Sequence, residues 1–265
     1  MQGRNNTCVQ TFADLFHYWS KTSPNYISIT EMATPPTNTT TTNNHENSSL
    51  TNFDHDAVLK IQIPHLSPDV ISTCTITVNS KVWFAKLCTF RWYAMRFRNL
   101  YVVCEDPVLG WSRPLFLHVE AARYYANNPV FNPRGLALQS RESKRSKDGP
   151  EHFQVDHKDH NTLNCVCISG GPDYPSNLRI CTNQQNAWNR RPRETYGGRQ
   201  VSSQYKGVSR TRAGNWKVDF GSKKLVPCGR IRKTFDTEIK AAKFYDACAI
   251  KYYKEFAVLN CPSSV

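Results

Sequence analysis

The sequence predicts an α+β protein, and three observations support this class. Between positions 58 and 104, short runs of β-branched and aromatic residues recur in the manner of antiparallel strands. Near the C-terminus, three further runs of this kind precede a segment with apolar residues every three to four positions, which is typical of an amphipathic helix. A hydrophobic fraction of 39% over 265 residues is sufficient for one large domain or two to three small ones.

Residues 1–55 are predicted to form a disordered low-complexity tail. Positions 34–49 consist mainly of Thr, Asn, Ser and Pro, and such a composition cannot bury a core. One short helix is expected at positions 12–19, where the residues are apolar and aromatic.

Residues 56–150 are predicted to be a β-rich segment that ends in a basic loop. Strands are expected at 58–63, 74–78, 81–84, 90–94 and 100–104. Residues 114–118 lead into a helix expected at 119–124. The connection that follows contains a basic run at 140–147, for which a solvated loop, a DNA-phosphate contact and a nuclear-import patch all stay open.

The charge balance points to a polyanionic partner. Lys and Arg number 34 against 21 Asp and Glu, a net charge of +13, which fits nucleic acid or an anionic membrane surface. No apolar run approaches the roughly 18 residues that a membrane span needs, and no secretory signal pattern is present. We therefore expect no membrane association, an intracellular location where DNA is (the nucleus in a eukaryote), and reduced thiols for the ten cysteines.

The middle of the chain combines groups that can hydrolyse a phosphodiester. Asp156 and His157 are adjacent, and Asn177 follows about twenty residues later, where we expect a helix to begin. A carboxylate and an amide oxygen can hold Mg²⁺ and leave coordination sites open for phosphate. A neighbouring imidazole can take a proton from water. The pattern predicts a metal-dependent nuclease site.

The same stretch resembles an HNH endonuclease of the homing type, a family of mobile elements. The resemblance is carried by residues 155–157 (Val-Asp-His), 176–182 (Ser-Asn-Leu-Arg-Ile-Cys-Thr) and 185–189 (Gln-Asn-Ala-Trp-Asn). It implies a ββα-metal nuclease fold over residues 151–190. Two departures from the family pattern are a Leu-Asn pair at 163–164, where Asp-Asn is usual, and a loop at 166–175 with two Gly and two Pro.

The resemblance also implies roles for individual residues. His157 would be the general base, and Asp156 and Asn177 would ligate Mg²⁺ (or Mn²⁺). Three supporting residues are expected: Arg179 as a phosphate contact or the partner of a carboxylate, Asn186 as a brace or cap of the helix, and His118 either in packing at a helix start or as a recurrent histidine of the family.

Residues 204–261 are predicted to form a small domain of three strands and one helix. The strands are expected at 205–210, 216–220 and 230–235, and Asp236 and Thr237 can cap the helix. One face of this helix carries Ala241, Ala242, Tyr245, Cys248, Ala249 and Tyr252. A single core under one side of the sheet leaves the other side free.

This domain resembles the Apetala/ethylene-response-factor type of DNA-binding domain. The resemblance rests on residues 205–208 (Tyr-Lys-Gly-Val), 216–217 (Trp-Lys), 234–237 (Thr-Phe-Asp-Thr), 241–242 (Ala-Ala), 245–247 (Tyr-Asp-Ala) and 256–260 (Phe-Ala-Val-Leu-Asn). It implies that strand side chains contact DNA, and the matching positions are Lys206, Arg210, Arg212, Trp216, Lys217, Arg230 and Arg232. For Trp216, a role in the core alone stays open.

Charge supports DNA binding independently of this resemblance. Residues 190–233 contain thirteen Lys and Arg and only two acidic residues. This range includes a predicted basic linker at 191–203. Ser209, where the family commonly has Arg, and the Arg-Ala pair at 212–213, where it commonly has Pro-Trp, depart from the plant pattern. The base preference of that family is therefore not transferred.

The sequence as a whole predicts a metal-dependent DNA endonuclease of the HNH homing type that acts on double-stranded DNA, with no protein partner. Two alternatives stay open. One is a non-catalytic, sequence-specific DNA-binding regulator that retains a degenerate nuclease fold. The other is a zinc-stabilised binding module that uses Cys165, Cys167 and Cys181.

Overall fold

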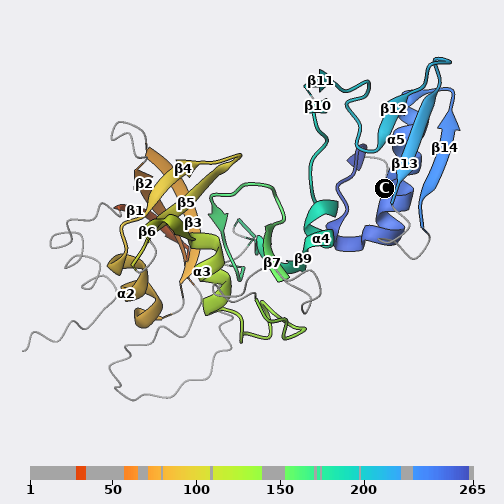
Figure 1. Cartoon of the computed structure of the whole chain (residues 1–265). Helices are drawn as coiled ribbons and strands as arrows, with labels where there is room; N and C mark the ends of the chain where they lie inside the picture. The colour runs from red at the N-terminus through yellow and green to blue at the C-terminus, as the bar shows by residue number, and fades with distance from the viewer. Residues whose placement is uncertain are drawn as a thin grey trace, which may run out of the picture. The chain divides into compact units, whose positions relative to one another are not determined.

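The computed structural model describes residues 28–33, 57–64, 71–78, 80–107, 110–138, 153–169, 172–173, 175–196, 198–221 and 229–262. The helix expected at 12–19, the low-complexity run at 34–49 and the basic run at 140–147 lie outside these residues. The described chain is α+β, as predicted, with several small sheets and few helices (Figure 1). It divides into two compact units, Met1–Leu138 with Val155–Ile180, and Gln139–Gln154 with Cys181–Val265.

The first unit contains a four-stranded sheet in the order β1-β2-β3-β8. Its strands are β1 (Ser28–Ala33), β2 (Ala57–Pro64), β3 (Ile71–Val78) and β8 (Asn164–Cys165). The first three are antiparallel, and β8 runs parallel to β3. The two strands expected at 58–63 and 74–78 are thus present, and β8 brings the chain after His157 onto this sheet.

Strand β1 is a correction to the prediction of a mostly disordered tail over residues 1–55. Its backbone pairs with β2 from Ser28, opposite Gln62, to Ala33, opposite Val58. Composition averaged over the whole segment hides this strand, because the Ser-Ile-Thr-Glu-Met-Ala run contains the β-branched residues that strands favour.

Helix α2 (Lys81–Thr89) corrects the strand that we expected at 81–84. The Ser80 hydroxyl accepts a hydrogen bond from the Trp83 backbone N–H at 3.1 Å and caps the helix. The buried side chains recur at helical spacing: Trp83, Phe84, Leu87 and Cys88. The Trp83 indole also donates to the Thr77 carbonyl at 3.1 Å. Burial of these four side chains therefore outweighs the strand preference of the Val-Trp-Phe run.

The first unit also contains a second, three-stranded antiparallel sheet. It consists of β4 (Tyr93–Arg96), β5 (Leu100–Asp106) and β6 (Gly110–Phe116), and helix α3 (Leu117–Tyr124) follows directly. Strand β4 begins three residues later than the strand expected at 90–94, and α3 begins two residues earlier than the helix expected at 119–124. Val102, Val103 and Cys104 on β5 are all buried, so both faces of this strand are covered.

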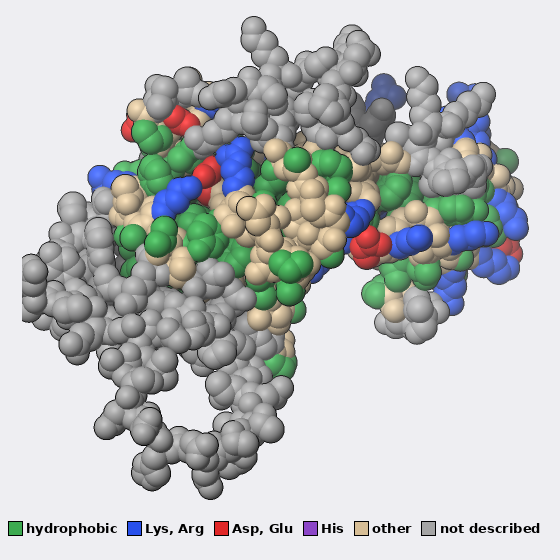
Figure 2. All heavy atoms as spheres, turned by 90° about the horizontal axis from the view of Figure 1, so that it is seen from below, with side chains coloured by type: hydrophobic (Ala, Val, Ile, Leu, Met, Phe, Trp, Pro, Cys, Tyr) green, Lys and Arg blue, Asp and Glu red, His purple; other side chains and the backbone are tan. Residues whose placement is uncertain are grey.

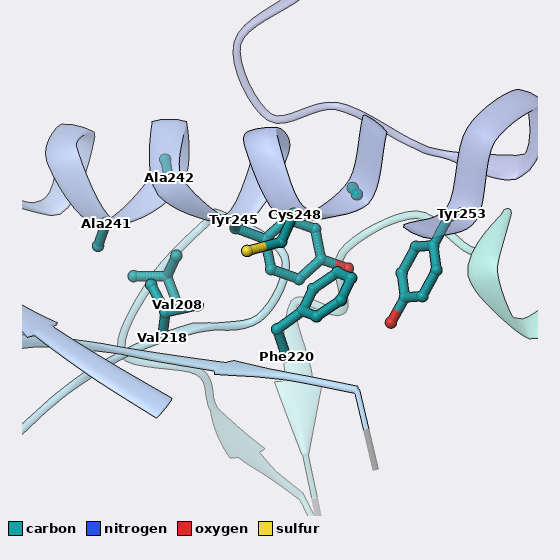
Figure 3. Packing of buried hydrophobic residues seen from close by; sticks show 9 residues of the cluster. Val208, Val218, Phe220, Ala241, Ala242, Tyr245, Cys248 and Tyr253 are labelled. Carbon is teal, nitrogen blue, oxygen red and sulfur yellow. The ribbon is translucent and has the colours of Figure 1, made fainter. Parts of the chain in front are cut away.

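The second unit contains the predicted sheet of three strands and its helix. The strands β12 (Val208–Arg210), β13 (Trp216–Phe220) and β14 (Ile231–Phe235) are antiparallel neighbours. Thr237 caps helix α5 (Glu238–Tyr253) through its side chain, and the 3-10 helix η1 (Lys254–Phe256) follows. Figure 3 shows Val218 and Phe220 directed from the sheet toward the helix residues Ala242 and Tyr245. The helix face predicted from spacing is the buried face, except that Tyr253 is buried more deeply than Tyr252.

Gly207 lies where the chain enters β12 and passes close to helix α5. Its φ is +73°, in the left-handed region that favours glycine. A Cβ atom at this position would lie 2.3 Å from a ring carbon of Tyr245. The Gly207 carbonyl also accepts a hydrogen bond from the Asp219 N–H at 2.9 Å. The backbone here therefore fits directly against the aromatic ring.

The segment predicted as a basic linker contains a short two-stranded ribbon, β10 (Thr195–Tyr196) and β11 (Arg199–Gln200). In the same unit, the indole of Trp188 stacks on the Tyr253 ring with a centroid separation of 4.5 Å. In the part of the chain that the structure describes, every helix is too short or too polar to cross a bilayer.

Candidate functional site

The candidate site lies on two paired strands that precede a short helix. Strand β7 (Phe153–His157) pairs with β9 (Leu178–Thr182), and helix α4 (Asn183–Trp188) begins after Thr182. The prediction that Asn177 begins a helix is wrong, because residues 178–182 form β9. Buried Leu178 and Ile180 alternate along this strand, and the helix starts where Thr182 and Gln185 form a reciprocal capping box.

Asp156 and His157 occupy the C-terminal end of β7, and both are buried. The Asp156 Oδ2 atom accepts hydrogen bonds from Nε and Nη2 of Arg179 on β9, each at 2.8 Å. Of the two roles expected for Arg179, the structure therefore contains the carboxylate partner. A charged partner holds a buried carboxylate in one orientation and offsets part of its desolvation cost.

The ring of His157 packs beside a second histidine. The ring centroids of His118 and His157 are 4.9 Å apart, and Tyr101 lies 5.4 Å from His118 and 6.3 Å from His157. Burial, and secondarily His157, lower the pKa of His118 well below the usual range for histidine. His118 is thus a neutral ring near pH 7 that packs at the start of α3 and at the same time contacts His157.

Asn177 connects three segments through hydrogen bonds. Its Oδ1 accepts from the Asp159 N–H at 3.0 Å, and its Nδ2 donates to the Asn164 carbonyl at 2.7 Å. Its backbone N–H donates to the Val166 carbonyl at 2.8 Å, and its carbonyl accepts from the Lys158 N–H at 3.0 Å. Asn177 therefore holds the loop 158–164 against the start of β9.

Two further residues of this loop stabilise its shape. Asp159 accepts the Asn161 N–H at 2.7 Å and the Asn164 side-chain amide at 2.9 Å. Asn164 is the second residue of the Leu-Asn pair, in which Leu163 is the residue that departs from the Asp-Asn of the family pattern, and the Asn164 amide takes part in this network. Lys158 donates to the Ser176 hydroxyl at 2.8 Å, and burial together with Arg179 lowers the pKa of Lys158.

Asn186 lies in the second unit, on α4. Its side-chain Nδ2 donates to Gln154 Oε1 at 3.0 Å, so the amide joins the helix to the first half of β7. This contact corresponds to a bracing role. Gln154 and Asn186 are far apart in the sequence, so residue spacing alone could not have identified Gln154 as the partner of Asn186.

The three cysteines of the zinc alternative are buried. Among the residues that the structure describes, no group of three or more His, Cys, Asp or Glu is arranged to hold a metal ion. A hydrogen bond with Cys74, followed by burial, raises the pKa of the Cys165 thiol well above its usual range. The burial of all three side chains agrees with the interpretation of these residues as small buried hydrophobes.

The register of the C-terminal sheet divides the predicted DNA-binding residues between its two faces. Lys217 adjoins the buried Val218 on β13, so its side chain lies on the face away from α5. Arg232 adjoins Lys233, the cross-strand partner of Val218, and therefore lies on the same face as Lys217. Asp219 shares this face and accepts two hydrogen bonds from exposed Arg230, at 2.6 and 2.5 Å. The Arg230 hydrogen bond lowers the pKa of Asp219, so this carboxylate offsets part of the positive charge.

The remaining predicted positions lie elsewhere on this domain. Trp216 is half-buried against the core on the helix side, and the Arg210 guanidinium lies 5.8 Å from its ring centroid. Lys206 donates to the Trp188 carbonyl, and burial, with a smaller effect of Arg190, lowers its pKa to about 8. Arg212 is exposed in the turn between β12 and β13. Figure 2 shows many Lys and Arg side chains on the surface of this unit.

Comparison with known proteins gives one informative match. Over 111 residues the chain is 32% identical to an uncharacterised HNH endonuclease of Acanthamoeba polyphaga mimivirus, which covers 42% of this chain and 49% of the viral protein. The chain thus spans about half the length of this relative. No family model and no solved structure matches. The similarity supports a nuclease of the HNH type and leaves the resemblance of the C-terminal domain as a prediction.

Proposed function

We propose that this protein is a metal-dependent DNA endonuclease of the HNH type. The observation that carries the proposal is the buried Asp156–His157 pair at the end of β7, with Arg179 of β9 bound to the Asp156 carboxylate at 2.8 Å. The similarity to a viral protein named as an HNH endonuclease supports the same class.

His157 is proposed as the general base that takes a proton from the attacking water. Its neighbour His118 is a neutral ring at pH 7, so it places no positive charge beside the His157 ring. The Arg179 hydrogen bonds hold Asp156, and with it the end of β7, in a fixed orientation. A general base of this kind contributes typically 10² to 10⁴-fold to the rate.

The side chains of Asp156 and Asn177 are proposed to hold Mg²⁺ or Mn²⁺. The donor chemistry fits, because a carboxylate and an amide oxygen are the hard ligands that these ions prefer, and each oxygen has more than one lone pair. The ion would neutralise negative charge on the scissile phosphate and on the leaving 3′ oxygen, which by resemblance yields 3′-hydroxyl and 5′-phosphate ends. Asn177 in addition braces the loop 158–164.

The C-terminal domain is proposed to position double-stranded DNA as an Apetala/ethylene-response-factor-type reader. Lys217 and Arg232 share the sheet face opposite to α5, and the exposed Arg212 lies in the adjacent turn. Phosphate contacts from such residues supply affinity and register. Trp216 is proposed to support this face from the core side, since it packs against the buried cluster.

The experiment that tests the function is cleavage of supercoiled plasmids that carry a random target library. The protein is incubated with Mg²⁺, with Mn²⁺ or with EDTA, and wild type is compared with His157→Ala. His160→Asn is the matched control, because it removes a nearby imidazole while Asn tolerates the positive φ of that position. We expect metal-dependent nicking or linearisation that falls 10² to 10⁴-fold in His157→Ala and persists in His160→Asn.

Two results would contradict the proposal. Cleavage by His157→Ala at the wild-type rate would show that His157 is not the general base. DNA binding without cleavage in either metal would favour a regulator that retains a degenerate nuclease fold.

A further inference from the structure

The turn between β4 and β5 exposes an aromatic ring between two arginines. The Phe97 N–H donates to the Asn99 carbonyl at 2.9 Å and closes the turn. The Phe97 side chain is 46% exposed, and Arg96, Arg98 and Asn99 are exposed as well. Among the described residues, no ion pair involves Arg96 or Arg98. The turn therefore presents two charges and a large apolar surface together.

This turn is joined to the candidate nuclease site by a row of rings. The ring centroid of Phe97 lies 5.5 Å from that of Phe116 and 6.3 Å from that of Tyr101. Tyr101 in turn lies 6.3 Å from His157. Because all of these residues belong to the first unit, a single aromatic ring separates the exposed turn from the imidazole of His157.

A second contact fixes the turn relative to the loop that follows His157. The hydroxyl of Thr162 donates a hydrogen bond to the carbonyl of Leu100, the first residue of β5. Asn177 holds the same loop from the other side, through Asp159 and Asn164. The turn and the loop 158–164 are thus held together by hydrogen bonds within the first unit.

The chemistry of the turn suits a DNA strand. Arginines that are not neutralised by carboxylates bind phosphate oxygens, and an exposed Phe can pack against deoxyribose or enter between base steps from the minor groove. Nearly half of the Phe97 side chain faces solvent although two rings contact it, so apolar surface is available to a ligand. An apolar protein partner would not need an arginine on each side of the ring.

We propose that the β4–β5 turn binds the DNA strand beside the scissile phosphate. Arg96 and Arg98 hold the phosphates on either side, and Phe97 packs against the sugar or bases between them. The turn then acts as a second DNA contact, separate from the C-terminal sheet, that aligns the backbone with His157. This assignment rests on the proposed nuclease function for its location, but the DNA contact itself can be measured without cleavage.

The first test measures DNA affinity of the full chain in EDTA, by fluorescence anisotropy with a labelled duplex library over a range of salt concentrations. Each lost phosphate contact reduces the slope of log affinity against log salt by about one. We expect Arg96→Ala/Arg98→Ala to reduce this slope by about two, with an unchanged melting temperature. Arg91→Ala is the matched control, because Arg91 is exposed, precedes β4 at the end of the strand away from the turn, and lies over the Tyr93 ring. An unchanged slope in the double variant would overturn the proposal.

The second test measures cleavage with Mg²⁺. Phe97→Ala is expected to lower kcat/KM about tenfold, and Phe97→Tyr is expected to restore it because the ring is retained. Val82→Ala, at an exposed position on α2, is the control for loss of surface apolar area. Equal rates in wild type and Phe97→Ala would contradict the role of the ring.

The two tests fail separately. A wild-type protein that cuts no DNA, together with a reduced salt slope in the double variant, would reject the nuclease and retain the DNA contact. Cleavage by wild type, together with an unchanged salt slope in the double variant, would retain the nuclease and reject the DNA contact of the turn.

Discussion

The C-terminal sheet with its helix and the loop 158–164 are stabilised in different ways. The first is built on an apolar cluster in which Phe220, Tyr245 and Tyr253 pack against small helix residues (Figure 3). The second is held by the amides and carboxylates of Asp159, Asn164 and Asn177. An apolar core tolerates many exchanges of similar volume, whereas each hydrogen bond of the loop depends on one specific donor and one specific acceptor, so the loss of one side chain removes the bonds that it makes. The comparison predicts where each kind of change acts.

The largest effect is expected for Phe220→Ala in the C-terminal core. Phe220 is fully buried and stacks on Tyr253 with a centroid separation of 4.6 Å. Loss of a buried Phe costs about 3 to 5 kcal/mol, which is comparable to the whole free energy of unfolding of a small domain. Thermal unfolding followed by tryptophan fluorescence should show a C-terminal unit that is largely unfolded at 37 °C. Thr234→Ala, on the exposed face, is the control, and a normal transition in Phe220→Ala would contradict the assigned core.

Part of the C-terminal domain could be predicted from the sequence because its apolar residues recur at regular spacings. Strand β13 and the buried face of α5 follow from apolar alternation and from the spacing of Ala241, Ala242 and Tyr245. Helix α2 could not be predicted in this way, because its Val-Trp-Phe run fits a strand as well as a helix. Its helical state is decided by burial of Trp83 against Thr77 and by the Ser80 cap.

A second, smaller effect is expected for variants of Asn177. These variants separate its proposed role as a metal ligand from its role in bracing the loop 158–164. Asn177→Ala leaves the Asp159 N–H and the Asn164 carbonyl without their partner, which costs about 1 to 3 kcal/mol for each group that stays buried. Hydrogen exchange of residues 158–166 should accelerate, while exchange in α5 should not change. Asn177→Asp keeps an oxygen for a metal but removes the Nδ2 donor. Full cleavage by Asn177→Asp would mean that the bracing hydrogen bond to Asn164 is dispensable.

The candidate site could be predicted only in part from the sequence. The Asp156–His157 pair and its Arg179 partner lie together, as the resemblance led us to expect. The side-chain amide of Asn177 contacts residues 13 and 18 positions away in the sequence. Such pairs have no period in the sequence, so the strand β9 was mistaken for the start of a helix.

A third effect concerns the stability of the first unit as the pH falls. The folded state lowers the pKa of His118, so below the ordinary value of 6.5 the unfolded chain binds a proton that the folded chain does not. Stability from this group is present above pH 6.5 and is lost as the pH falls, by at most about 1.4 kcal/mol per pH unit. The melting temperature of His118→Phe should depend less on pH between 7 and 5 than that of wild type. Parallel curves for the two proteins would contradict the assignment.

The smallest effect is expected on the outer face of the C-terminal sheet. Lys217→Ala should reduce the salt slope of DNA binding by about one, because it removes one phosphate contact. Lys233 is the matched control, since it lies on the helix side, 5.0 Å from the Phe244 ring centroid. Equal slopes in Lys217→Ala and Lys233→Ala, measured by anisotropy in EDTA, would mean that the sheet face is not what binds DNA.

Gly207 has a consequence for how such domains diverge over time. Two independent constraints meet at this residue, a left-handed backbone and the ring of Tyr245 at 2.3 Å from any Cβ. Basic residues on the outer face can be exchanged as the recognised DNA changes, but a side chain at position 207 would push the sheet away from α5. Among descendants of this chain, Gly207 and the ring at position 245 are therefore expected to persist together after the arginines and lysines have been replaced.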